Sequence, residues 1–532
     1  METSAGESTN VWMIHHISSE TMLTATVAVG ILAGMAASIL WYDLETFGLE
    51  ARHDRIAQIA CLRTNVALEP QSEGLVLYNR ISPDYLPSPY ACMVHGISPR
   101  RTLEEGIPEY QFAKAIRNEM LSPGTCVAGY NSIRFDDEFI RNLLYRNLYD
   151  PYEREWADGN SRWDVIDLFR ACRDLRPDGL SWPDTAEGKP DFRLGSLASA
   201  NGIDLEKAHD ALCDIMATIG ISRLVRQAQP KLYDWYWKHR TKDTLRPLID
   251  LAERTPLLHS SAAYTSQLGC TTIVAPVGMV PGRRDSVVAI DLRYDPSPLV
   301  ELPVDEIRRR VFSRKEQLDE DERIPLTEIR LARCPYLAPL SILDGKAADR
   351  LGLDPGLAAE RARKLGREPA LIQKLAAVFA PRDREAAEAD PEYRIYSGGF
   401  FRDEDKDSME AIHEVIATLG PAEARHQAYA TSFLDERLPQ LVRRLFARNW
   451  PQTMSKTEAA RWRSFCAGRL LCPRIEGATD FENFTKTVEK LLASLDTEPG
   501  SKRVLLELLE YRRTLESEIL SYSDKEASGP RA

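Results

Sequence analysis

Four acidic side chains and one histidine have the types and the spacing that metal-dependent hydrolysis requires. Asp43 and Glu45 lie in Ile39-Leu-Trp-Tyr-Asp-Leu-Glu-Thr-Phe-Gly48, Asp136 lies in Gly129-Tyr-Asn-Ser-Ile-Arg-Phe-Asp-Asp137, and His209 and Asp214 lie in Ala208-His-Asp-Ala-Leu-Cys-Asp214. Carboxylate oxygens gathered at one point are the ligands that Mg²⁺ and Mn²⁺ prefer. A histidine beside them can accept a proton from an attacking water. The set therefore indicates hydrolysis of phosphodiesters with two metal ions.

The elements expected around these residues would bring them together. The apolar run at 39–42 is typical of a buried strand. Since alternate residues of a strand point to the same side, Asp43 and Glu45 share a face. Residues 125–130 predict a second buried strand, followed by a helix with Asp136 in its first turn. A third segment, at about 208–227, predicts a helix that carries Asp214. Taken alone, each acid is more typical of a solvated surface residue or a helix cap than of a catalytic residue, and only the ordered set favours catalysis.

Beyond the acids, several longer segments carry a resemblance to a known family. These are Tyr145-Arg-Asn-Leu-Tyr-Asp-Pro-Tyr152, Asn160-Ser-Arg-Trp-Asp164, Leu175-Arg-Pro-Asp-Gly179, Cys334-Pro-Tyr-Leu-Ala338 and Ala447-Arg-Asn-Trp-Pro451. With them the chain resembles the DEDD superfamily of 3′→5′ exonucleases, in the branch with a His-x-x-x-x-Asp third motif. Within that branch it is most similar to the bacterial exodeoxyribonuclease I family. The resemblance extends from about residue 38 to near residue 511.

The resemblance implies roles for individual residues. It implies that Asp43, Glu45, Asp136 and Asp214 bind two Mg²⁺ ions, for which Mn²⁺ can substitute, and that His209 is the general base. It also implies that Glu45 and Arg193 contact the nucleotide, and that Arg141, Tyr152, Trp156 and Arg170 contact the DNA strand. These types fit, because aromatic rings stack on unpaired bases and arginines hold phosphates. Tyr152 and Trp156 are four residues apart, so a packing pair on a helix is the alternative.

The fold that the resemblance implies is α/β with three domains. An RNase H-like exonuclease domain is expected at 38–228, an SH3-like β-barrel domain at 229–382 and a C-terminal helical domain at 392–520. Strand-forming runs at 271–275, 286–292 and 328–332 agree with the second domain. Residues 381–391 are charged and bounded by prolines, as in a linker. Helical apolar spacing follows at 438–446, 456–465, 481–495 and 502–520.

Composition limits the class of protein. The chain has 532 residues, of which 43% are hydrophobic, which is enough for two or three domains with real cores. Its net charge of −12 argues against a protein that coats nucleic acids, because such proteins are usually basic. The nine cysteines form no C-x-x-C pair, which is typical of reduced thiols in a cytoplasm.

The N-terminal region raises a separate question. Residues 22–42 contain no charged side chain, which superficially suggests a membrane span. However, residues 38–42 are needed as the first strand of the catalytic domain. A secretory signal would begin with a basic region, whereas residues 1–21 contain no Lys or Arg. We therefore expect an N-terminal extension at 1–37 and no membrane association. Our hypothesis is that residues 1–34 arise from translation upstream of Met35. A membrane-tethered nuclease is the alternative.

These observations predict a 3′→5′ exodeoxyribonuclease that degrades single-stranded DNA to 5′-mononucleotides in DNA repair and recombination. The resemblance further implies a monomer that binds the C-terminal tail of the single-stranded-DNA-binding protein. One alternative is an exoribonuclease of the same superfamily, although such enzymes are usually much shorter. Another is a catalytically silent scaffold that binds single strands, which the intact set of acids disfavours.

Overall fold

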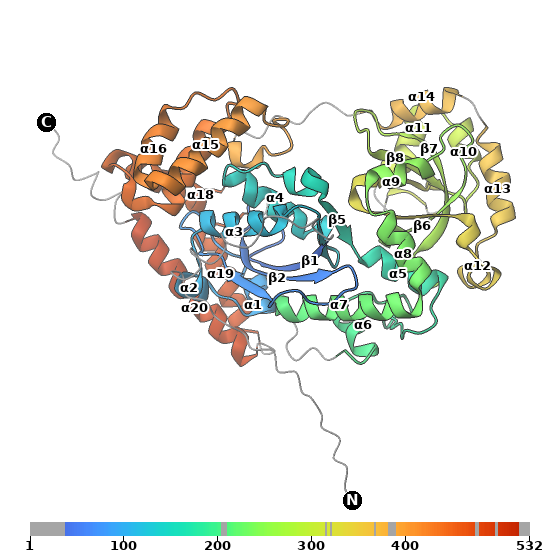
Figure 1. The fold of residues 1–532 in the computed structure, drawn as a ribbon, viewed down its shortest axis with the longest axis horizontal. Helices are drawn as coiled ribbons and strands as arrows, with labels where there is room; N and C mark the ends of the chain where they lie inside the picture. The colour runs from blue at the N-terminus through green and yellow to red at the C-terminus, as the bar shows by residue number, and fades with distance from the viewer. Residues whose placement is uncertain are drawn as a thin grey trace, which may run out of the picture.

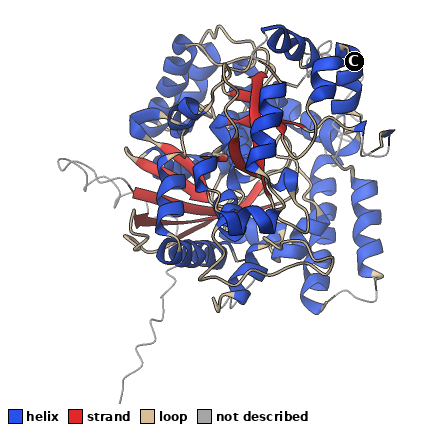
Figure 2. Cartoon of the chain, turned by 90° about the vertical axis from the view of Figure 1, so that its right-hand side faces the viewer, coloured by secondary structure: helices blue, strands red, loops and turns tan. Residues whose placement is uncertain are grey.

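Two five-stranded sheets form the centre of the protein, and helices surround them (Figures 1 and 2). The computed structural model describes residues 38–203, 210–313, 317–319, 322–366, 369–380, 390–473, 478–494 and 498–520. The N-terminal extension expected at 1–37 and the predicted base His209 lie outside these residues.

The first sheet is mixed and has β1 (Ser38–Thr46) at its centre. Its order is β3-β2-β1-β4-β5, with β2 at Ile56–Asn65, β3 at Leu75–Tyr78, β4 at Thr125–Gly129 and β5 at Ser161–Asp164. β1 pairs antiparallel with β2 and parallel with β4, and β4 pairs parallel with β5. Four successive residues from Ile39 are buried, because a central strand with helices on both faces needs apolar side chains on both sides.

Alternate residues of β1 enter two different cores. Ile39 and Trp41 pack with α5 (Ile166–Leu175) and α7 (Ala211–Ala228). Leu40 and Tyr42 pack with α3 (Glu109–Leu121) and α4 (Asp136–Arg146). Asp43 therefore continues the face that α7 covers, which is the face that the strand period predicts for Glu45 as well.

The second sheet is antiparallel throughout, in the order β10-β6-β7-β8-β9. Its strands are β6 (Leu257–Ser260), β7 (Thr271–Met279), β8 (Ser286–Asp291), β9 (Leu326–Arg330) and β10 (Tyr336–Pro339). The helices of this region are α10 (Ser297–Glu301), α11 (Val304–Phe312), α12 (Gly345–Leu351), α13 (Pro355–Lys364) and α14 (Pro369–Val378). Two helices, α8 (Pro230–Lys238) and α9 (Lys242–Leu245), connect the two sheets, and α8 packs on α5 and α7.

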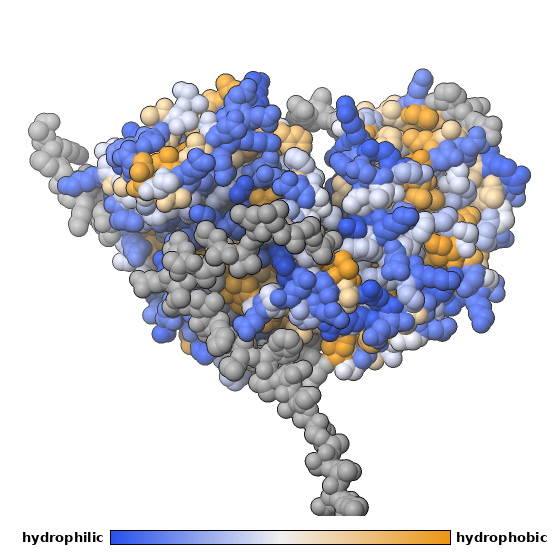
Figure 3. All heavy atoms as spheres, in the orientation of Figure 1, coloured by the Kyte–Doolittle hydropathy of each residue, from blue (hydrophilic) through white to orange (hydrophobic). Residues whose placement is uncertain are grey.

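The remaining helices lie around the first sheet. Short helices α1 (Pro89–His95), α2 (Pro99–Glu105) and α6 (Leu194–Ala200) belong to the first part of the chain. The C-terminal helices are α15 (Asp403–Leu419), α16 (Pro421–Ala430), α17 (Leu438–Asn449), α18 (Lys456–Leu471), α19 (Phe481–Leu492) and α20 (Pro499–Leu520). α17 contacts α3, and α20 contacts α1 and α2. Figure 3 shows a hollow at the upper edge, between the region of α15 and α16 and the region of α14.

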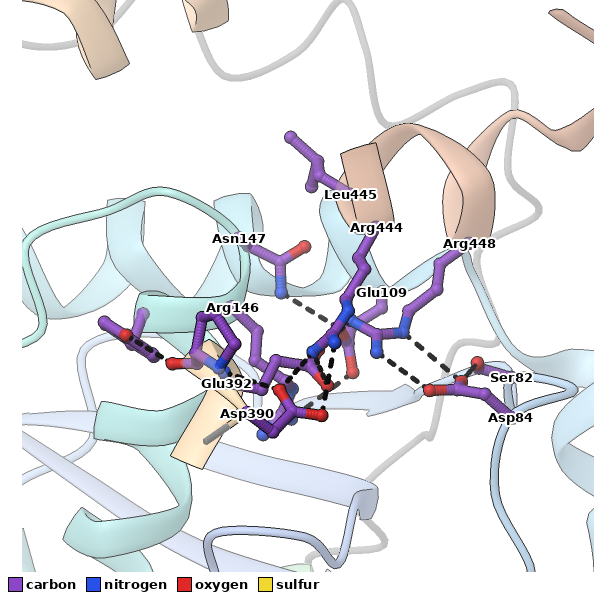
Figure 4. A network of polar contacts seen from close by, with 12 residues as sticks. Ser82, Asp84, Glu109, Arg146, Asn147, Asp390, Glu392, Arg444, Leu445 and Arg448 are labelled. Carbon is purple, nitrogen blue, oxygen red and sulfur yellow. Dashed lines mark hydrogen bonds and ion pairs between the residues drawn. The ribbon is translucent and has the colours of Figure 1, made fainter. Parts of the chain in front are cut away.

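A buried network of arginines and acids joins the C-terminal helices to the first part of the chain (Figure 4). The carboxylate of Asp84 lies 2.8 Å from Arg448 on α17 and 2.8 Å from Arg469 on α18. Glu392 is fully buried and pairs with the same two arginines and with Arg444, which is 3.2 Å away. Such charges are stable in the interior only because each has a partner of opposite sign.

This network predicts that the protein loses stability in acid. Burial acts to raise the pKa of Asp84 and of Glu392, but Arg448 and Arg469 hold both values far below the ordinary range. A carboxyl whose pKa is depressed by folding stabilises the protein above its unfolded pKa of about 4 and loses that effect as the pH falls. We expect the melting temperature to drop as the pH falls below about 5. Differential scanning fluorimetry would measure it, and Glu392→Gln should show a shallower decline. A wild-type melting temperature that stays the same between neutral and acidic pH would contradict the expectation.

Two further observations concern the expectations about compartment. In the described segments, no helix has the length and apolar character that a membrane crossing requires. All nine cysteines lie in described segments and are free thiols, eight of them buried or half-buried.

Candidate active site

Three of the predicted acids come together beside the first sheet. Ligand oxygens of Asp43, Glu45 and Asp214 all lie within 4.8 Å of one another. β1 supplies the first two from one face, and α7 supplies Asp214 from its first turn. The start of α7 is held by Asp210, whose carboxylate accepts hydrogen bonds from the backbone N–H groups of Leu212 (3.1 Å) and Cys213 (3.4 Å).

Asp136 lies close to this group but outside it. It is the first residue of α4 and is buried. Burial raises the pKa of its carboxyl, and the charge of Asp43 raises it further. The structure therefore places all four predicted carboxylates in one neighbourhood, three of them in direct proximity.

The electrostatics of the group suit a bound divalent cation. Burial raises the pKa of Asp43, and the charge of Asp214 adds to this effect. Burial, followed by Asp43, Asp214 and Asp210, raises the pKa of Glu45 to about 9. Carboxylates that repel one another in this way are stabilised as anions by a divalent cation between them. The donor set consists of oxygens only, so it fits Mg²⁺ or Mn²⁺ better than metals that prefer thiolate or imidazole ligands.

A neighbouring acid, Asp137, positions the strand and the helix that carry the site. Its buried carboxylate accepts a hydrogen bond from the hydroxyl of Tyr42 (2.7 Å) and pairs with Arg154 (2.8 Å) and Arg162 (2.6 Å). Burial acts to raise the pKa of Asp137, but the two arginines hold it well below its ordinary value. The sequence analysis assigned no role to Asp137, and the Asp-Asp pair at the start of α4 was the available signal.

The turn after Glu45 depends on a close contact at Gly48. The hydroxyl of Thr46 donates to the carbonyl of Gly48 (2.7 Å), and the carboxylate of Asp54 accepts from the N–H of Glu50 (2.8 Å). A Cβ atom on Gly48 would lie 2.0 Å from Asp54 Oδ2. Only glycine lets the chain pass Asp54 at this distance.

We expect Gly48→Ala to impair both stability and activity. The methyl group must displace Asp54 or the turn, which costs about 1–3 kcal/mol for a crowded interior site. The turn adjoins Glu45, so the displacement should also lower the cleavage rate at saturating substrate. Thermal denaturation and steady-state kinetics measure the two effects. Gly345→Ala is the matched control, because a Cβ there would meet nothing within 4 Å. Equal behaviour of the two variants would contradict this interpretation.

The residues predicted to contact the DNA strand differ in how exposed their side chains are and in whether they form ion pairs. Trp156 is 65% exposed, and the Arg193 side chain is 78% exposed although it pairs with Asp191. Arg141 is largely buried between Glu138 (2.9 Å) and Glu155 (2.8 Å).

The other two predicted contacts are more enclosed. Arg170 is buried beside Asp167 (2.5 Å) and lies over the ring of Phe192. The ring of Tyr152 is half-buried and packs edge-on against Phe400, with centroids 5.2 Å apart.

Comparison with known proteins places this geometry in a family. Family models match residues 40–222 (Exonuclease), 240–381 (Exonuclease I SH3-like domain) and 389–515 (Exonuclease I C-terminal domain). Exodeoxyribonuclease I of Escherichia coli is 38% identical over 426 residues, which cover 80% of this chain and 88% of that protein. The chain belongs to the exodeoxyribonuclease I family. Exodeoxyribonuclease I of Haemophilus influenzae is 34% identical over 89% of this chain and 98% of its own length.

Solved exonuclease I structures have the same fold. Exonuclease I from Methylocaldum szegediense superposes with a TM-score of 0.84 at 39% identity, covering 90% of this chain and 99% of that one. E. coli exonuclease I in complex with a dA16 oligonucleotide superposes with a TM-score of 0.84 at 34% identity, covering 90% of this chain and 100% of that one. The predicted fold class, an exonuclease domain followed by an SH3-like domain and a C-terminal helical domain, is confirmed.

The comparisons also weigh against the exoribonuclease alternative. The oligoribonuclease of Bos taurus mitochondria is 32% identical over 131 residues, which cover only 23% of this chain. That similarity is confined to about a quarter of the chain, whereas exodeoxyribonuclease I relatives match most of it. The E. coli enzyme has also been solved with a zinc ion and single-stranded DNA, so metal binding occurs in this family.

Proposed function

We propose that this protein is a 3′→5′ exodeoxyribonuclease that shortens single-stranded DNA and releases 5′-mononucleotides, in DNA repair and recombination. The observation that carries the proposal is the group of Asp43, Glu45 and Asp214, whose oxygens lie within 4.8 Å of one another, with Asp136 beside it. Membership of the exodeoxyribonuclease I family supports the same activity and makes an exoribonuclease or a silent scaffold less favoured.

In this proposal, Asp43, Glu45, Asp136 and Asp214 hold two Mg²⁺ ions, for which Mn²⁺ can substitute. When bound, such ions supply an activated water and neutralise charge on the scissile phosphate. Glu45 and Arg193 hold the terminal nucleotide. His209 takes the proton of the attacking water as general base. The oxygen-only donor set and the raised pKa of Glu45 support the assignment of the metal ligands.

The residues proposed to contact the DNA strand are of two kinds, exposed side chains and side chains held by acidic partners. Trp156 and Arg193 expose enough surface to touch the strand directly, by stacking and by a phosphate contact. Arg141 and Arg170 are tied to acids, so they present a guanidinium whose orientation is already fixed. Tyr152 adds a half-buried ring, over which the guanidinium of Arg141 lies.

We also propose an organisation and a setting for the enzyme. The exonuclease domain spans 38–228, the SH3-like domain 229–382 and the C-terminal helical domain 392–520, in a monomer that works in the cytoplasm. The acidic C-terminal tail of the single-stranded-DNA-binding protein is its protein partner. Family membership supports these proposals, and the free cysteines agree with a reducing compartment.

The activity is tested with 5′-labelled single-stranded DNA, matched RNA and duplex DNA, each with Mg²⁺ or EDTA. We expect a Mg²⁺-dependent ladder that shortens from the 3′ end of single-stranded DNA and is absent for Asp214→Ala. Preferential loss of the RNA would instead indicate an exoribonuclease. Binding of single strands without any cleavage would indicate a silent scaffold.

A further inference from the structure

The turn that follows β9 of the second sheet lies against elements that carry the candidate active site. It consists of Leu331–Arg333 and of Cys334, which precedes β10. Cys334 has a left-handed backbone, with φ of 52° and ψ of 49°. A residue with a Cβ atom keeps this conformation only where its surroundings hold it, because the conformation itself costs free energy. The contacts that hold this turn lead to the first sheet.

Arg162 makes the first of these contacts. It lies on β5, an edge strand of the first sheet (Figure 1), and its side chain is buried. Its Nη2 donates a hydrogen bond to the carbonyl of Ala332 (2.8 Å) and lies 2.9 Å from Glu155. Its Nη1 lies 2.6 Å from the carboxylate of Asp137. One guanidinium thus joins the turn after β9 to the residue next to Asp136.

Asp137 connects this arginine to two elements that carry proposed metal ligands. Asp136 is the preceding residue on the first turn of α4. The hydroxyl of Tyr42, the residue before Asp43 on β1, donates to the second oxygen of Asp137. A shift of Asp137 would therefore move Asp136 relative to Asp43. Such a shift matters, because catalytic side chains must be held within about 0.5 Å of their working geometry.

Tyr236 makes a second contact between the same turn and the first sheet. It is buried on α8, and its hydroxyl lies 2.6 Å from the carbonyl oxygen of Cys334 and 2.8 Å from that of Asp164. Asp164 ends β5, and its carboxylate accepts hydrogen bonds from the backbone N–H groups of Asn131 (2.9 Å) and Ile133 (3.2 Å). These two residues lie between β4 and α4, so Asp164 fixes how the chain enters α4.

We infer that Arg162 and Tyr236 are positioning residues, through which the turn at 331–334 of the SH3-like domain holds the metal-binding carboxylates at their working separation. The inference rests on the proposed function and deepens it, because it makes the second domain part of the geometry of the catalytic site. Arg162 acts through Asp137, and Tyr236 acts through Asp164. Removal of a residue that orients metal ligands in this way typically lowers metal affinity or activity by about 10–100-fold.

The first experiment measures metal binding without catalysis. Binding of Mn²⁺ to the DNA-free protein would be followed by electron paramagnetic resonance of the free ion, for wild type, Arg162→Lys and Tyr236→Phe. Lysine keeps the charge but lacks the planar fork with which arginine reaches two acceptors at once. We expect Arg162→Lys to bind Mn²⁺ about tenfold more weakly. Tyr236→Phe removes one neutral hydrogen-bonding group and should bind about threefold more weakly.

Each variant can overturn its own part of the inference. Wild-type Mn²⁺ affinity of Arg162→Lys would overturn the positioning role of Arg162. Wild-type Mn²⁺ affinity of Tyr236→Phe would overturn the second contact.

Arg425→Lys is the matched control. The Arg425 side chain is 9% exposed, against 8% for Arg162, and its guanidinium lies 2.6 Å from Glu458. This pair joins α16 to α18, which carry none of the proposed metal ligands. We expect Arg425→Lys to bind Mn²⁺ as wild type does, and thermal melting would verify that all variants are folded. Equal weakening in Arg425→Lys and Arg162→Lys would mean that a general loosening of the fold lowers metal affinity, which would overturn the positioning role.

A second measurement separates positioning from substrate binding. Single-turnover cleavage at saturating single-stranded DNA gives the rate, and anisotropy of a labelled oligo(dT) in EDTA gives the affinity for the strand. We expect Arg162→Lys to lose at least about tenfold in rate while its affinity for oligo(dT) stays that of wild type, because the proposed strand contacts are other side chains. A loss of affinity as large as the loss of rate would overturn the positioning role.

The wild-type protein separates the failure of this inference from that of the proposed function. If wild type binds Mn²⁺ and degrades single-stranded DNA while Arg162→Lys and Tyr236→Phe match it in both, only this inference fails. If wild type neither binds Mn²⁺ nor cleaves, the proposed function fails and this inference fails with it.

Discussion

Asp43→Asn is expected to slow cleavage of single-stranded DNA by at least about a thousandfold, because a metal ligand at the reacting phosphate contributes several kcal/mol to the transition state. Asp43 is central to the group, since its charge acts on both Glu45 and Asp136. The substitution nearly preserves the shape of the side chain, removes its charge and replaces one carboxylate oxygen by an NH2 group that cannot bind a metal. Binding of the strand should persist, because the proposed strand contacts lie on other residues. Single-turnover cleavage and anisotropy in EDTA measure the two quantities separately.

The matched control for this change is Asp243→Asn. The Asp243 side chain is 75% exposed, and among the described residues its ion-pair partner is Arg246, at the long distance of 3.8 Å. The Asp243→Asn variant should therefore cleave DNA at the wild-type rate. If Asp43→Asn retained a rate near that of Asp243→Asn, the assignment of Asp43 as a metal ligand would be wrong.

Glu392→Gln is expected to lower the free energy of unfolding by about 3–5 kcal/mol, the range for removing one partner of a buried ion pair. Glu392 is fully buried and faces Arg444 and Arg448 (Figure 4). It also pairs with Arg469. Without its charge, three guanidinium groups are left with less compensation in a region shielded from water. Urea denaturation monitored by circular dichroism would measure the loss. Limited proteolysis should show earlier release of the C-terminal helices, which the network ties to Asp84.

An exposed ion pair provides the comparison. Glu104 and Arg100 form a pair with both side chains 61% exposed. Glu104→Gln should cost at most about 0.5 kcal/mol, because water and salt screen charges at the surface. Similar losses for Glu392→Gln and Glu104→Gln would mean that the buried network does not hold the C-terminal helices in place.

Local patterns determined the parts of the site that depend on one element at a time. A strand repeats every two residues, so Asp43 and Glu45 had to share a face, and the structure has them on one face of β1. The helix expected to carry Asp136 in its first turn is α4, which begins at that residue, and Asp214 lies in the first turn of α7. Five strands were not predicted. Four of these, β3, β5, β6 and β10, have only four residues, which are too few to show a period, and the fifth is the ten-residue strand β2.

Only the tertiary structure decided which of these elements meet, and through which side chains. Arg448 and Arg469, which pair with Asp84, are 364 and 385 residues away along the chain, and Glu138 meets Tyr396 across 258 residues. No periodicity encodes such pairs, because each depends on how whole elements pack. The same holds for Asp137, whose sequence context suggests a helix cap, and for Gly48, whose need for glycine comes from Asp54. The sequence by itself determined the acids, their faces and the family, because these follow from local spacing and motif. The junctions that hold the acids in place follow from long-range packing, and the folded chain alone reveals them.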